Sequence, residues 1–181
     1  MTSTPTLEIL HPLPLLYEAA AHPLPDFELV DAKALPAAAH RLLVHTGDMT
    51  SKLEESFGEE MALRVLQCDH TPEHYRREVV LFCEKSGQPV EYGAIEIELG
   101  SFDETLRGEI VLGHSPLGGL LNRHHVRYRS RPRGFLRVAP DLRLAELFHL
   151  PAPVVLYGRT NQLLDAQDRV LASIVEVLRP T

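Results

Sequence analysis

Hydrophobic positions recur with helical spacing in two short segments that follow Pro36. Pro36 directly precedes an alanine-rich run at 37–43. This order predicts a helix that has proline in its first turn and that Gly47 ends. Asp48 or Thr50 can cap a second short helix, and Gly58 ends it. These segments predict two neighbouring helices ahead of the first strand.

Strand-like patterns follow at 63–68, 75–82 and 90–99, and a Gly-Gln-Pro turn separates the last two. In the third segment Ile95 and Ile97 alternate with Glu96 and Glu98, so its two faces differ. The loops are short. These three strands predict an antiparallel meander.

Helical spacing returns at 102–112 and at 117–122, interrupted by the turn at 113–116. Strand-like runs then occupy 126–138, 154–161 and 169–178, with a turn at 165–168. Strands that cluster before and after a helical insertion are typical of an α+β fold with an antiparallel sheet and flanking helices.

The N-terminal stretch lacks this regularity, since six of the 14 prolines lie within residues 1–36. We expect an irregular lead-in at 1–36, with one short helix near 15–21, followed by a single domain at 37–181.

Composition narrows the class of protein. Of 181 residues, 44% are hydrophobic and 24% are charged, which excludes a mainly disordered chain. The net charge of −7 disfavours general nucleic-acid binding. No apolar run is long enough for a membrane helix, and residues 1–14 lack the basic end of a signal peptide. We expect a cytoplasmic protein, with a monomer favoured and with Cys68 and Cys83 reduced.

Two charged residues lie inside apolar strands. Arg77 shares a strand face with Tyr75 and Val79, and Glu176 lies between Val175 and Val177. A buried charge needs a partner. Arg77 is therefore either one half of an ion pair, with an acid such as Glu78, or a clamp for a ligand carboxylate. Glu176 is either paired with an arginine or a proton-transfer group whose pKa burial raises.

Other chemistry is weakly indicated. The ten histidines and two cysteines show no metal-binding spacing, and the glycine-rich run at 113–119 is not a phosphate-binding loop, so we expect neither metal nor cofactor. An arginine stripe at 127–133 indicates a solvated strand face or attraction of an anionic molecule; nucleic acid is disfavoured because no aromatic stacking pattern accompanies it.

Five short motifs in this order resemble the chorismate lyase family, from about residue 42 to residue 180. They are Asp48-Met49-Thr50, the strand Tyr75-Arg76-Arg77-Glu78-Val79-Val80-Leu81, the turn Ser115-Pro116-Leu117-Gly118, the strand Leu156-Tyr157-Gly158-Arg159 and the terminal Val175-Glu176-Val177-Leu178.

The resemblance implies an antiparallel sheet whose helical flaps enclose a metal-free site. By motif position, Arg77 would bind the carboxylate of an aromatic ligand and Glu176 would contact its ring hydroxyl. Backbone N–H groups of Met49 and Leu117 would complete the pocket. The family carries an arginine after the glycine of the third strand, where this chain has Ala94.

Two functions follow from the resemblance. The first is a lyase of aromatic-acid or ubiquinone biosynthesis, which converts chorismate to 4-hydroxybenzoate, or a related hydroxybenzoate, and pyruvate without a cofactor, with Glu176 and Arg77 catalytic. The second is a non-catalytic module that binds a small aromatic carboxylate, since related folds serve as effector-binding domains of transcription regulators.

Overall fold

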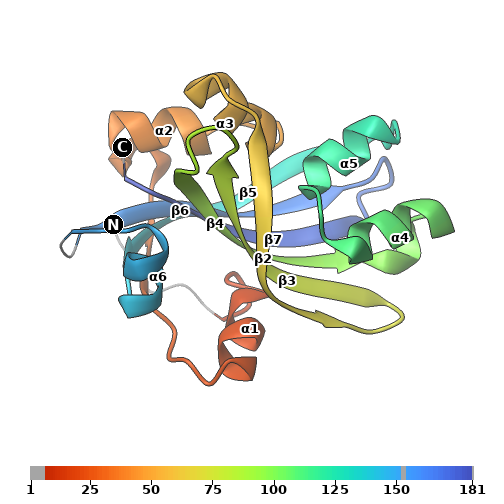
Figure 1. Ribbon diagram of the computed structural model, residues 1–181, viewed down its shortest axis with the longest axis horizontal. Coiled ribbons are helices and arrows are strands. Elements are labelled where there is room, and N and C mark those ends of the chain that lie inside the picture. Colours follow the sequence, from red (N-terminus) through yellow and green to blue (C-terminus); the bar gives the residue numbers. More distant parts are fainter. Residues whose placement is uncertain (1–6, 152–153, 181) are drawn as a thin grey trace.

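A computed structural model describes residues 7–151 and 154–180. Its core is one seven-stranded sheet of order β1-β5-β6-β7-β4-β3-β2, in which every neighbouring pair is antiparallel (Figure 1). The strands are β1 (Asp26–Val30), β2 (Met61–His70), β3 (His74–Cys83), β4 (Pro89–Glu98), β5 (Arg129–Ala139), β6 (Leu156–Leu164) and β7 (Val170–Leu178). The helices are α1 (Leu13–Ala19), α2 (Ala37–Leu43), α3 (Met49–Phe57), α4 (Glu104–Leu112), α5 (Leu117–Arg123) and α6 (Leu142–Leu147), with 3-10 turns η1 (Ala32–Ala34) and η2 (Leu99–Ser101).

This architecture confirms the predicted α+β fold with an antiparallel sheet and helices packed against it. The expected meander is β2-β3-β4. The strand that follows β4 in the sheet is β7, because the chain leaves through α4 and α5, forms β5 and β6, and returns beside β4. The C-terminal strand therefore lies in the middle of the sheet.

Local signals set the ends of the helices that cover the sheet. The Asp48 side chain accepts a hydrogen bond from the Ser51 N–H at 2.8 Å and caps α3, and Gly58 ends that helix at a φ of 67°. Asp103 and Gly113 do the same for α4. The helix α2 ends at Leu43, earlier than the expected end at Gly47, because Val44 leaves the helical conformation.

The N-terminal segment differs from the expected irregular lead-in. The short helix expected there is present as α1, but the segment also contains the edge strand β1, which was not expected; β1 pairs with β5 and places Phe27 in the core. Among the described prolines, Pro12 and Pro14 lie at the start of α1, where a missing N–H costs little, and Pro23 and Pro25 precede β1. The helix α6, capped by Asp141, was also not expected. The domain boundary at residue 36 stays a prediction.

Helices cover both faces of the sheet. Figure 1 shows α1 and α6 on one side and α2, α3 and α5 on the other. On the first side, Tyr17 and Phe148 pack with Tyr92 and Val177 in one apolar cluster. On the other side, α3 and α5 cover the strands that carry Arg77 and Glu176. None of the helices in the described part of the chain has the length and hydropathy needed to cross a membrane.

We expect Gly158→Ala to destabilise the sheet. A Cβ at this position would lie 2.2 Å from the backbone oxygen of Glu176, so β6 and β7 would have to separate. The free energy of unfolding should fall by about 3 kcal/mol, which lowers the melting temperature by roughly 6–12 °C. Gly108→Ala is the control, because Gly108 is exposed in α4 with no heavy atom within 4 Å. Thermal unfolding should show a small gain there; equal melting temperatures for wild type and Gly158→Ala would contradict the packing argument.

Candidate functional site: a cavity beside an unpaired arginine

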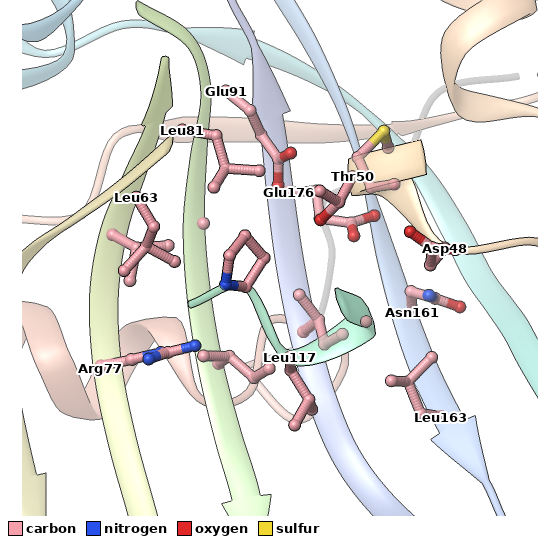
Figure 2. Close-up of a pocket in the computed structure, with 17 residues that line it drawn as sticks. Asp48, Thr50, Leu63, Arg77, Leu81, Glu91, Leu117, Asn161, Leu163 and Glu176 are labelled. Atoms are coloured by element: carbon pink, nitrogen blue, oxygen red, sulfur yellow. The ribbon is translucent and has the colours of Figure 1, made fainter. Parts of the chain in front are cut away.

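A cavity of about 70 Å³ lies between one face of the sheet and the first turns of α3 and α5 (Figure 2). Its floor comes from alternate residues of five neighbouring strands, which point to the same face. The floor residues are Leu63, Arg77, Val79, Leu81, Glu91, Gly93, Ile95, Asn161, Leu163, Ile174 and Glu176, and the roof residues are Asp48, Met49, Thr50, Pro116, Leu117 and Gly118. Roughly five waters would fill this volume, so the cavity suits a small molecule.

The structure brings together the four site residues named from the sequence. Arg77 and Glu176 lie on the floor, from β3 and β7, and Met49 and Leu117 begin the two roof helices. Figure 2 shows Arg77 at one end of the group and Glu176 toward the other. Their roles toward a ligand stay predictions.

Arg77 is a buried cation without a counter-charge. Its side chain is 1% exposed, and Nη2 donates to the Ser115 carbonyl at 3.1 Å. Nε and Nη1 have no hydrogen-bond partner, although the guanidinium carbon lies 5.7 Å from the centre of the Tyr75 ring. Burial lowers the pKa of Arg77, but a guanidinium stays charged at neutral pH.

The predicted alternative for Arg77, an ion pair with Glu78, is not formed. Glu78 points to the opposite face of β3, where Arg143 and Tyr92 bind its carboxylate. Arg76 likewise binds Glu96, and Arg159 binds Glu176. Within the described residues, Arg77 is the arginine of the sheet interior that no acid neutralises.

Glu176 follows the structural alternative stated for it, a buried glutamate paired with an arginine. Nε of Arg159, on the neighbouring strand, donates to its carboxylate. Arg159 also donates from Nη1 to the carbonyls of Leu43 and His45, at 3.1 and 3.2 Å, and so ties the end of α2 to the sheet. Arg159 was predicted only as part of the motif Leu156-Tyr157-Gly158-Arg159, without a role of its own.

Glu91 is a second acid of the cavity that the sequence analysis missed. It is 4% exposed, and its Oε2 has no hydrogen-bond partner. Burial raises the pKa of Glu91 well above its ordinary value, and the charge of Glu176 raises it further, while Arg159 opposes the shift. The available signal was a glutamate on the strand face that otherwise carries Gly93, Ile95 and Ile97.

Two features marked in the sequence lie outside the cavity. Ala94, at the position where the family carries an arginine, packs with Tyr92 and Val175 on the other face of the sheet. The arginines at 127, 129, 131 and 133 are exposed, and Arg131 and Arg133 both donate to the side chain of Gln162. The solvated reading of that stripe fits this arrangement.

One group in the described residues has the composition of a metal site. His74, Glu96 and Glu98 place ligand atoms within 4.8 Å of one another. These residues point to the face of the sheet opposite the cavity, and Glu96 is already bound by Arg76 and His11. A cation there would have to displace both partners.

Sequence comparison finds no counterpart for this chain: neither a protein-family model nor a curated protein matches it. Solved structures do share its fold. PhnF from Mycobacterium smegmatis matches with a TM-score of 0.59 and 15% identity, over 77% of this chain and 66% of that chain. The effector domain of PhnF alone matches with a TM-score of 0.58 and 15% identity, over 77% of this chain and 92% of the domain. A possible transcriptional regulator, YydK from Bacillus subtilis, matches with a TM-score of 0.50 and 12% identity, over 65% of this chain and 57% of that chain.

These findings correct the expected function. The fold is the chorismate lyase-like fold, so the resemblance is confirmed at that level, but no sequence family supports membership of the lyases. The prediction of a chorismate-converting enzyme in aromatic-acid or ubiquinone biosynthesis is wrong, because the structures matched include the effector domain of PhnF and a possible transcriptional regulator. The catalytic roles expected for Arg77 and Glu176 depended on that activity and are not carried further.

We expect Arg77→Met to stabilise the ligand-free protein. Methionine fills similar space and removes an uncompensated buried charge, so the free energy of unfolding should rise by about 1–3 kcal/mol. Arg159→Met is the matched control: it strands the Glu176 carboxylate and should cost about 3–5 kcal/mol. Urea unfolding of the three proteins measures both effects. Equal losses in the two variants would mean that Arg77 is as well compensated as Arg159.

We also expect Glu91→Gln to change how stability depends on pH. With its pKa raised in the folded state, Glu91 keeps its proton there after the unfolded chain has released it, so wild-type stability falls as pH rises above about 4.5. Glutamine does not ionise and avoids that loss. Melting temperatures from pH 4 to 8 should therefore diverge in favour of the variant as pH rises. Glu84→Gln, on the exposed surface, should follow wild type; a Glu91→Gln variant that loses stability at pH 7 would show that Glu91 is an ionised, satisfied carboxylate.

Proposed function

We propose that this chain is a ligand-binding effector domain that takes a small organic carboxylate into the cavity beside Arg77. One observation carries the proposal: a buried guanidinium faces the cavity with Nε and Nη1 unpartnered and with no acid beside it. Leaving a charge buried without compensation costs several kcal/mol. An anion that enters the cavity removes that cost and forms charge-assisted hydrogen bonds.

The walls near Arg77 favour an anion with an apolar body. Val79 lies between Arg77 and Leu81 on the cavity face of β3, Leu81 is opposite Glu91, and Leu117 adds apolar surface from the roof. Such walls reward burial of apolar surface but offer no further charge. A compact carboxylic acid fits this distribution better than a phosphorylated or sugar-like ligand would.

The contacts of the roof support a regulatory role. Arg77 touches the ligand position and also donates to Ser115, which directly precedes α5. The first turn of α5 in turn lies against the N-cap of α3, where a Cβ on Gly118 would come within 2.9 Å of the Asp48 Cβ. A ligand that moves the Arg77 guanidinium therefore acts on both roof helices. The likeness to the effector domain of PhnF, which this chain covers almost fully, adds support.

Binding measurements test the proposal. Calorimetric titration with acetate, benzoate and 4-hydroxybenzoate, and with benzamide as the uncharged analogue, should show binding of at least one carboxylate and none of benzamide. Arg77→Met should weaken that binding by about 30-fold or more, as expected for loss of a buried charge-assisted contact of about 2–4 kcal/mol.

Arg131→Met is the matched control for this experiment, because it makes the same change of charge at an exposed arginine outside the cavity. It should bind as wild type does. Equal weakening in the two variants would reduce the effect to general electrostatic attraction, and undiminished binding by Arg77→Met would refute the proposed site.

A further inference from the structure

Glu91 lies at the end of the cavity opposite Arg77. Across the β3–β4 ladder, Arg77 is paired with Ile95, and Glu91 stands four residues further along β4, opposite Leu81. The two α-carbons are therefore separated by one strand spacing and four residues, roughly 14 Å. Both side chains reach into this interval, and Figure 2 shows them at opposite ends of the lining. The gap between the ends of the two side chains is therefore about as long as a small molecule.

The positive charge near Glu91 is already paired with another acid. Arg159 is the guanidinium nearest to this end of the cavity, and its Nε is bound to Glu176. The described residues show no ion pair for Glu91, and its Oε2 is buried without a partner. The remaining acid of the lining, Asp48, belongs to the roof and is bound by the N–H and the hydroxyl of Ser51. A second negative charge beside Glu176 would be uncompensated.

These surroundings favour the neutral form of Glu91. Burial and the neighbouring carboxylate both raise its pKa. A protonated carboxyl group has one O–H donor and one carbonyl acceptor. A neutral hydroxyl, which also donates one hydrogen bond and accepts others, satisfies both.

We infer that Glu91 determines which ligands the cavity accepts, by hydrogen bonding as a neutral acid to a hydroxyl at the end of the ligand opposite its carboxylate. This inference rests on the proposed function. In this inference Glu91 contacts the hydroxyl of the ligand. The resemblance implied Glu176 for that contact, but Arg159 binds the Glu176 carboxylate. The ligand class is thus a hydroxycarboxylic acid with its two groups at opposite ends of a short apolar body.

The alternative partner for Glu91 is an ammonium group of the ligand, which would stabilise Glu91 as a carboxylate. The two readings differ in what they require of the side chain. A hydroxyl needs a neutral donor and acceptor, which glutamine also supplies, whereas an ammonium needs a negative charge, which glutamine lacks. Substitution by glutamine therefore separates them.

The experiment compares three probes of one shape: 4-hydroxybenzoate, benzoate and 4-(aminomethyl)benzoate. Calorimetric titrations use wild type, Glu91→Gln, Glu91→Leu and the exposed control Glu84→Leu, each shown by thermal unfolding to be folded. Wild type should prefer 4-hydroxybenzoate over benzoate by at least about tenfold, because benzoate leaves the buried acid unpartnered. Glu91→Gln should keep that preference within about threefold. Glu91→Leu should bring the ratio close to one while binding of benzoate persists, and Glu84→Leu should match wild type.

Three results would overturn the inference. The first is a preference of wild type for 4-(aminomethyl)benzoate that Glu91→Gln abolishes, since Glu91 would then act as a carboxylate. The second is an unchanged preference for the hydroxyl in Glu91→Leu. The third is no binding, or no discrimination, by wild type among the three probes. If carboxylate binding still depends on Arg77 in any of these cases, the proposed function stands and the role of Glu91 alone fails.

Discussion

A guanidinium or carboxylate can be buried in a sheet only where other groups compensate its charge, and this constraint organises both faces of the molecule. Arg76, Arg143 and Arg159 each meet an acid from another strand or helix. Some of these contacts connect elements distant in sequence: Arg143 joins α6 to β3, and Arg159 joins β6 to the end of α2 through backbone carbonyls. Arg77 breaks the rule, and the cavity lies where it does so. The unmatched charge is a cost to folding, as is common at functional sites, and the anion of the proposed function would offset it.

Much of the fold was predictable because its signals are local. Asp48, Gly58 and Gly113 mark helix ends, and alternating apolar positions mark β3 and β4. The prediction missed β1 and α6. Prolines around β1 read as irregular chain, although proline is tolerated beside an edge strand, and the six residues of α6 give too short a pattern for a helical period to emerge.

The site was predictable in part, for a similar reason. A charge inside an apolar strand is visible in the sequence, and this singled out Arg77 and Glu176. The pairing of Glu176 with Arg159 was not visible, because it depends on the insertion of β7 between β4 and β6. Glu91 lies on an otherwise apolar strand face and was overlooked, whereas Arg159 stands among polar residues of β6 and showed no such signal. Function was the least predictable, since the motifs that resembled the lyases describe the shape of a pocket, and one fold serves unrelated functions.

The bond from Arg77 to the Ser115 carbonyl has a thermodynamic consequence beyond the cavity. Through this hydrogen bond, ligand binding in the cavity and the position of α5 would be coupled by one free energy. Linkage is reciprocal: any macromolecule that binds one placement of α5 in preference to another changes ligand affinity by the same factor by which the ligand changes its own binding. In the proposed function, the Arg77 guanidinium contacts both the ligand and Ser115, so ligand binding and macromolecule binding each change the affinity for the other.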